Sequence, residues 1–202
     1  MRSGRLLVSF VLFHGILWLA GSGPAASEWV DRILAVVNNE IITLSDVQKN
    51  QTLFGEGQDA QVMINELIDQ KLLMSEARKF EIPEPSDDSV DAAYQDLVRR
   101  FEDKEALTKT VEQMGLSELE LRLQLKARLR VGELLDQRVT FFVFVAPQEV
   151  EAYYEEHADD FSGQSAEQAK SAILDLLTRQ KAELKRKEYL DRLRSRATIR
   201  IN

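Results

Sequence analysis

The shortage of turn-forming residues is the feature that most constrains how this chain can fold. The chain holds nine glycines and four prolines in 202 residues, and four of those glycines and one of those prolines lie within residues 1–27. The other 175 residues therefore contain five glycines and three prolines, which is under 5% of that length. Average usage of the two residues together is about 12%, and folds built from many short strands need frequent turn residues. We therefore expect a mainly α-helical protein.

Residues 1–27 have the pattern of a secretory signal peptide. Two arginines precede a mostly apolar run over residues 6–20, and small side chains at 25–27 suit cleavage near Ser27. A retained membrane anchor is the alternative. However, the run is interrupted by His14 and is shorter than the roughly 20 residues that a transmembrane helix needs. We predict export of the protein and removal of this segment.

The rest of the chain has few of the side chains that catalysis and metal binding use. There is no cysteine, and His157 is the only histidine after residue 27. The absence of cysteine excludes thiol nucleophiles and cysteine zinc sites, and one histidine cannot build a histidine-rich metal centre. The net charge of −8 becomes −10 when residues 1–27 are removed, because they contain two arginines and no acid. We therefore predict no catalytic residue, no cofactor, no metal and no nucleic-acid partner.

The order of patterns predicts a β-hairpin followed by a series of helices. Two β-branched runs, 33–37 and 40–44, flank two asparagines, which suit a tight two-residue turn. Ser45, with Gln48 three residues later, predicts the N-cap of a short helix. Further helices are expected over 60–80, 86–101, 102–114, 117–139, 147–160 and 165–197, with a last strand over 199–201.

The helix expected over 117–139 alternates apolar and polar residues. Alternation normally predicts a strand, but this run is too long for a typical strand and is rich in helix-forming residues. On a helix its apolar residues separate into two opposite stripes, one beginning at Leu119 and one at Leu121. Either both stripes lie in a core, or one of them lines a groove.

The segments that follow combine aromatic residues with opposite charges. Residues 140–145 hold three phenylalanines among β-branched residues, which predicts a strand. The next helix carries six acids and no Lys or Arg over 148–160. Residues 179–200 carry nine Lys or Arg against three acids, a local charge of +6. We expect a solvated basic face that lies toward the acidic helix; nucleic acid or anionic lipid is the alternative reason for such a charge.

Several segments resemble the SurA-type periplasmic chaperones. The opening segment over 31–47, DRILAVVNNEIITLSDV, is similar to the start of that family. The same is true of ELIDQKLL at 66–73, LLDQRV at 134–139, PQEVEAYY at 147–154 and ATIRI at 197–201. The sequence departs from the family where a parvulin isomerase domain would follow the acidic helix, because only residues 161–164 lie between the two last helices.

The resemblance implies a mainly α fold. It would be a multi-helix chaperone core with a small N-terminal β-hairpin that the C-terminal strand could join. The expected parts are a signal peptide over 1–27, a helical module over 28–145, and C-terminal helices and a strand over 146–202 that pack back on the module.

The resemblance also implies a function. It predicts a periplasmic, ATP-independent chaperone, or holdase, without enzyme activity, which binds unfolded outer-membrane or other exported proteins in an apolar groove. The alternatives are a scaffold or assembly subunit of one cell-envelope pathway and, less favoured, an enzyme related to peptidyl-prolyl isomerases. The chain could also form a homo-oligomer. The residues that we predict to contact the client are Leu121, Leu125, Leu129, Phe142, Phe144 and Tyr154.

Overall fold

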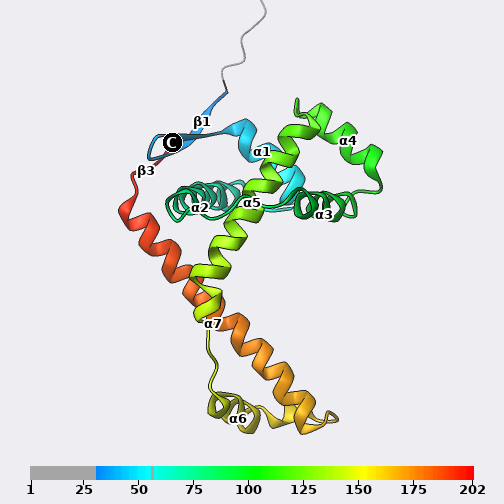
Figure 1. The fold of residues 1–202 in the computed structure, drawn as a ribbon, viewed down its shortest axis with the longest axis vertical. Helices are drawn as coiled ribbons and strands as arrows, with labels where there is room; N and C mark the ends of the chain where they lie inside the picture. The colour runs from blue at the N-terminus through cyan, green and yellow to red at the C-terminus, as the bar shows by residue number, and fades with distance from the viewer. Residues whose placement is uncertain (1–30, 56) are drawn as a thin grey trace, which may run out of the picture. The chain divides into compact units, whose positions relative to one another are not determined.

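A computed structural model describes residues 31–55 and 57–202, so the predicted signal peptide lies outside the described residues. Figure 1 shows a small sheet followed by a series of helices. The strands are β1 (Ile33–Val37), β2 (Glu40–Thr43) and β3 (Ile199–Ile201). The helices are α1 (Leu44–Phe54), α2 (Ala60–Lys79), α3 (Asp87–Val98), α4 (Lys104–Gln113), α5 (Glu118–Arg138), α6 (Pro147–Glu156) and α7 (Ala166–Arg196). The mainly α prediction is confirmed.

The sheet joins the two ends of the described chain. Its order is β2-β1-β3, and β1 pairs antiparallel with both neighbours. Asn38 has a φ of 54° in the turn between β1 and β2, which is the conformation that asparagine tolerates better than most residues. At the other edge Ala35 pairs with Ile201, and the amide N of Asn202 donates to the carbonyl O of Leu34 at 2.9 Å. The C-terminal strand therefore joins the hairpin, as the fold prediction allowed.

Side-chain caps decide where the helices begin. Ser117 and Ser165 form the predicted capping boxes at the starts of α5 and α7. The prediction for α1 was wrong by two residues, because Thr43 and Asp46 form its capping box and Ser45 lies inside the helix. Thr43 ends β2 in an extended conformation, with φ −104° and ψ 168°, so the chain passes directly from the strand into the helix.

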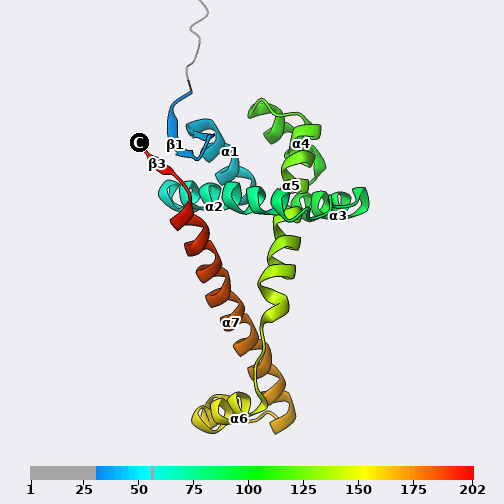
Figure 2. The same cartoon turned by 60° about the vertical axis from the view of Figure 1, so that its left-hand side comes forward.

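The largest core lies where the sheet meets α2, α5 and α7. Ile42, Ile68 and Leu134 are fully buried there, and Leu193 brings in the C-terminal half of α7. Arg194 fixes the same contact, because its Nε donates to Oδ1 of Asp69 on α2 at 2.6 Å. Figure 2 shows α7 running from α6 to β3, and it contacts both α6 and α2.

Two smaller cores lie outside the largest one. The first is built by the end of α1 with α3, α4 and α5, and its buried residues are Leu53, Val90, Tyr94, Leu97, Leu107, Val111, Leu121 and Leu125. The second joins α6 to the start of α7 around Val145, Val150 and Ile173. At this second core Lys181 on α7 pairs with Glu149 on α6 at 2.6 Å, so a cation of the basic segment does meet the acidic helix. The division of the chain at residue 145 stays a prediction.

Residues 140–145 do not form the predicted strand. Thr140–Phe142 form a 3-10 turn, and the amide N of Val143 donates to the carbonyl O of Thr140 at 2.9 Å. β-branched and aromatic residues favour extended backbone, but a strand also needs a neighbouring strand to pair with. In the described part of the chain, the sheet holds only β1, β2 and β3. The prediction was wrong because the sequence pattern does not reveal whether such a partner exists.

Candidate functional site

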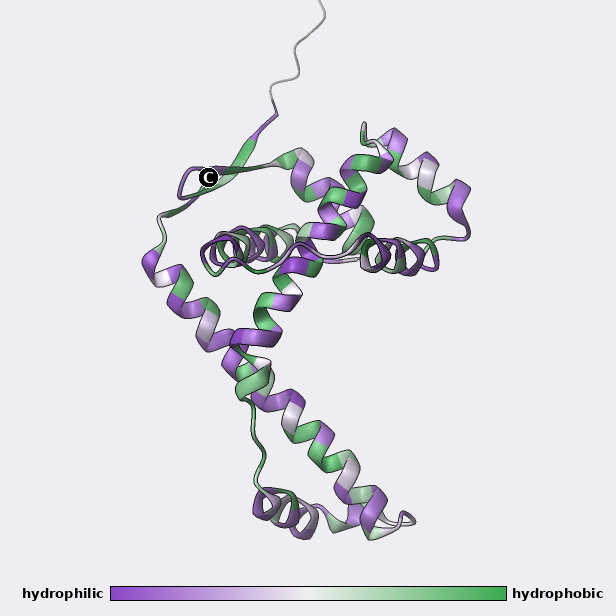
Figure 3. Ribbon diagram, in the orientation of Figure 1, coloured by the Kyte–Doolittle hydropathy of each residue, from purple (hydrophilic) through white to green (hydrophobic). Residues whose placement is uncertain are grey.

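Three phenylalanines lie exposed in the connection between α5 and α6. Phe141, Phe142 and Phe144 expose 80%, 63% and 73% of their surface. Figure 3 colours much of this connection as hydrophobic. Leaving one large apolar side chain in water forgoes roughly 1.5–3 kcal/mol of burial energy. We call residues 141–144 the aromatic segment and treat it as the candidate site, because three such side chains within four residues form a patch rather than scattered exposure.

The aromatic segment is anchored at both ends. Val139 before it and Val145 after it are 4% and 8% exposed, so the chain is buried at each end of the segment. The 3-10 turn places the rings of Phe141 and Phe142 edge to face, with centroids 5.3 Å apart. From α7, Nζ of Lys181 donates to the carbonyl O of Phe144 at 3.0 Å. The backbone is therefore held in place while the rings remain open to solvent.

One face of α7 lies beside this segment. A hollow of about 180 Å³ is lined by Phe142 and Val139 together with Arg138 of α5 and Lys185, Glu188 and Arg192 of α7. Leu184, which is 62% exposed, lies three residues after Lys181 and four before Glu188, so it shares this face of the helix. The candidate surface therefore combines three exposed rings, one exposed leucine and several cations.

The predicted site residues fall into different environments. Leu121 and Leu125 are 1% and 5% exposed in the core formed with α3 and α4, and Leu129 packs against the same core. These positions contradict a surface role for Leu121 and Leu125, because neighbouring helices cover both side chains. The stripe left open at the start of α5 is the opposite one, where Leu119 and Leu123 are 67% and 56% exposed. The alternation in the sequence predicted two apolar faces on α5, but it did not indicate which face α3 and α4 would cover.

Two of the three remaining predicted residues belong to the aromatic segment, and the third lies on α6. The two in the segment are Phe142 and Phe144. Tyr154 is partly buried on α6, where it packs with Phe161 in the second of the smaller cores. We did not predict Phe141 as a site residue, although it belongs to the same phenylalanine-rich run. We did not predict Leu184 either, because helical spacing alone does not indicate which face of α7 lies beside the aromatic segment. Whether these side chains bind a client stays a prediction.

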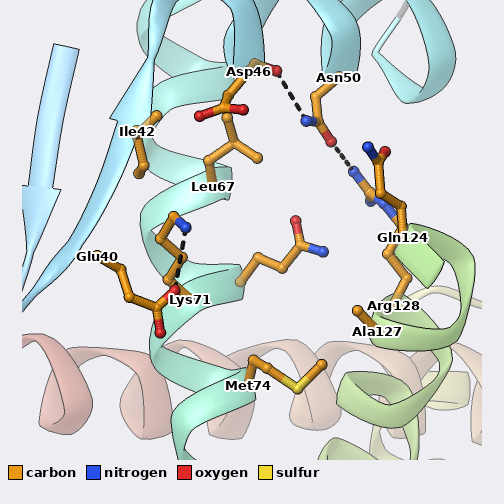
Figure 4. Close-up of a pocket in the computed structure, with 11 residues that line it drawn as sticks. Glu40, Ile42, Asp46, Asn50, Leu67, Lys71, Met74, Gln124, Ala127 and Arg128 are labelled. Atoms are coloured by element: carbon orange, nitrogen blue, oxygen red, sulfur yellow. Dashed lines mark hydrogen bonds and ion pairs between the residues drawn. The ribbon is translucent and has the colours of Figure 1, made fainter. Parts of the chain in front are cut away.

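A second hollow, of about 250 Å³, lies between β2, α1, α2 and α5 (Figure 4). Two of the charged side chains that line it, Glu40 and Lys71, form an ion pair. Glu40 accepts hydrogen bonds from Lys71 at 3.2 Å and from Arg78 at 3.0 Å. Burial works to raise the pKa of Glu40, but these two cations outweigh it and hold that pKa below its usual value. Arg128 donates to Oδ1 of Asn50 at 2.8 Å, and burial lowers the arginine's pKa. These contacts link β2 to α2 and α1 to α5, so we assign this hollow a structural role.

The described residues offer little support for other chemistry. Within residues 31–55 and 57–202, no group of three or more His, Cys, Asp or Glu side chains is placed to hold a metal ion. Over the same ranges, no helix combines the length and apolar character that crossing a membrane requires. His157 lies at the end of α6, and its ring stacks on the ring of Tyr153 with centroids 4.0 Å apart.

Comparison with known proteins identifies the relatives of this chain. No protein-family model matches it. The curated protein "Chaperone SurA" of Alkalilimnicola ehrlichii is 27% identical over 169 residues, which cover 77% of this chain and 39% of that protein. The chain is a homologue of SurA. It spans about two fifths of the length of that SurA.

A solved structure from Campylobacter jejuni shows the same fold. It comes from work that describes the virulence factor PEB4 and the periplasmic protein Cj1289 as two structurally related SurA-like chaperones. The alignment covers 85% of this chain and 99% of that chain, with a TM-score of 0.56 and 14% identity. The SurA resemblance and the mainly α, SurA-like fold that we predicted from the sequence are therefore confirmed. Between α6 and α7 the chain has only a 3-10 turn, Ala158–Phe161, and short connections.

Proposed function

We propose that this protein is a periplasmic, ATP-independent chaperone that holds unfolded outer-membrane or other exported proteins. The exposed aromatic segment is the observation that carries this proposal, because three anchored phenylalanines offer apolar contacts that the fold itself does not use. The SurA homologue, named a chaperone, supports the general role. The work on the structural neighbour describes two SurA-like chaperones and calls one of them periplasmic, which supports the compartment by analogy.

The mechanism would be passive binding and release. Burying the three rings and Leu184 against a client would yield roughly 6–12 kcal/mol before costs. Association costs about 4 kcal/mol or more, while a micromolar complex needs about 8 kcal/mol net. The expected affinity is therefore micromolar or weaker. Such complexes exchange readily, so a client could leave as soon as folding or insertion offers it a better state, and no nucleotide would be needed.

The proposed parts of the chain follow from this role. Residues 1–27 would direct export and be removed. Residues 28–145 would form the helical module, and residues 146–202 would return to it through α7 and β3. The surface between them, where the aromatic segment meets α7, would receive the client. We propose no catalytic step, and the purified protein should not accelerate prolyl isomerisation of a test peptide above the uncatalysed rate.

Aggregation suppression tests the proposal. An unfolded outer-membrane barrel protein is diluted from denaturant with and without the purified chain, and light scattering is followed. The wild type should suppress aggregation in proportion to its concentration. Changing Phe141, Phe142 and Phe144 together to Ser should abolish most of that effect.

A matched control comes from exposed leucines elsewhere. Leu119→Ser with Leu123→Ser removes similarly exposed apolar side chains from the start of α5 and should leave suppression unchanged. Absence of suppression by the wild type, together with no binding at tens of micromolar, would refute the chaperone role. Equal suppression by the wild type and the phenylalanine variant would place the site elsewhere.

A further inference from the structure

The aromatic segment is bordered by cations that have no carboxylate partner. Arg138, Lys185 and Arg192 line the hollow beside Phe142, and Glu188 is the one acid that lines it. Within the described residues, none of the three cations makes an ion pair. The hollow therefore carries a local charge of about +2 next to exposed rings. This is the opposite sign to the chain as a whole, whose net charge is −8.

The arrangement of these cations leaves them open to a ligand. Arg138 lies over the ring of Phe80, with its guanidinium carbon 3.9 Å from the ring centroid. That contact holds the guanidinium in place without neutralising it. Lys185 and Arg192 are exposed and lie seven residues apart on α7, two helical turns along the same face. Lys181 differs from them, because Glu149 neutralises it.

We propose that this surface selects apolar polypeptide segments flanked by aspartate or glutamate. This inference rests on the proposed chaperone function and names its preferred client. The rings would take the apolar side chains, and the three cations would meet the flanking carboxylates. At physiological ionic strength charges are screened beyond about 8 Å, so the nearby cations, not the distant acids of the chain, would set the preference. Segments flanked by lysine would meet the same cations and be repelled.

Two matched peptides test the preference. Both carry the same phenylalanine-rich core, with two aspartates at each end in one and two lysines at each end in the other. Fluorescence anisotropy with the full chain at about 0.15 M salt should show the aspartate peptide binding roughly three- to tenfold more tightly. At about 1 M salt, where the screening length falls to about 3 Å, the two affinities should converge.

Charge-reversal variants locate the effect. Lys185→Glu with Arg192→Glu should invert the preference without removing binding. The control, Arg179→Glu with Lys187→Glu, makes the same change of charge on exposed residues that lie on other faces of α7, and it should leave the preference intact. Thermal unfolding of both variants confirms that each is folded.

The outcomes separate this inference from the proposed function. Binding of neither peptide would refute the chaperone surface itself. Equal binding of both peptides, or a preference that the control variant also inverts, would refute the charge selection and leave the chaperone role standing. Tighter binding to vesicles of anionic phospholipid than to the aspartate peptide, lost in the Lys185 and Arg192 variant, would assign the cations to a membrane surface and overturn the proposal.

Discussion

Replacement of Arg194 by Ala tests how the C-terminal helix is held on the rest of the fold. Its Nε donates to Asp69 at 2.6 Å, and one terminal nitrogen donates to the backbone carbonyl O of Asn65 at 3.1 Å. The side chains of Arg194 and Asp69 are 30% and 25% exposed, so the pair is neither fully solvated nor fully buried. Exposed pairs contribute about 0.2–1 kcal/mol, and hydrogen bonds to charged groups about 1.5–3 kcal/mol.

We therefore expect Arg194→Ala to lower the free energy of unfolding by about 1–3 kcal/mol. For a chain of this size each kcal/mol corresponds to roughly 2–4 °C in the midpoint of thermal unfolding. Urea unfolding followed by far-UV circular dichroism measures the change directly. Arg194→Lys keeps the charge but loses the forked geometry, and should recover only part of the loss.

The control for this prediction is Arg196→Ala. Arg196 is exposed at the end of the same helix and should change the free energy of unfolding by less than about 0.5 kcal/mol. If the Arg194 and Arg196 variants unfold at the same urea concentration, the contact with α2 does not hold α7 in solution. The same result would mean that the contact between Arg194 and Asp69 does not stabilise the packing of the C-terminal segment on the helical module.

Three further predictions concern the cores, the acid response and the sheet. Leu121→Ala should cost about 2–5 kcal/mol, and Leu123→Ala less than about 0.5 kcal/mol, in urea unfolding; similar costs would refute the assignment of the stripes. Glu40 has a lowered pKa in the folded state, so its contribution to stability is present above its ordinary value of 4.5 and is lost as the pH falls through the lowered folded value. Glu40→Gln should therefore flatten the fall of the urea midpoint between about pH 5 and pH 3, and an unchanged slope would contradict this. Deletion of residues 199–202 removes the partner of β1 and should increase amide hydrogen exchange at Val36, whereas unchanged exchange would mean that β3 does not protect that edge.

Local signals in the sequence were sufficient for most of the secondary structure. Some features depend only on residues close together in the sequence, so the sequence alone predicts them. They are the capping boxes at Ser117 and Ser165 and the turn at Asn38. The wrong predictions depended on distant neighbours. The strand expected over 140–145 lacked a partner in the described sheet, and Leu121 is buried because α3 and α4 cover it.

The candidate site was predictable only in part for the same reason. Phenylalanine favours burial as strongly as it favours contact with clients, so the sequence marks Phe142 and Phe144 as important without saying that they are exposed. Two of the neighbouring cations, Lys185 and Arg192, lie on α7, more than forty residues later, and only the folded chain brings them beside Phe142.

The pairing of β1 with β3 also constrains the order of folding. The partners Ala35 and Ile201 are separated by nearly the whole described sequence, so this contact closes a very long loop and forms slowly relative to local hairpins and helices. A chain that emerges from its N-terminus presents β1 with β2 on one side and an unpaired edge on the other until β3 arrives. An unpaired edge is a template for association with other chains. During that interval this protein would itself need protection from the kind of contact that we propose it prevents in others.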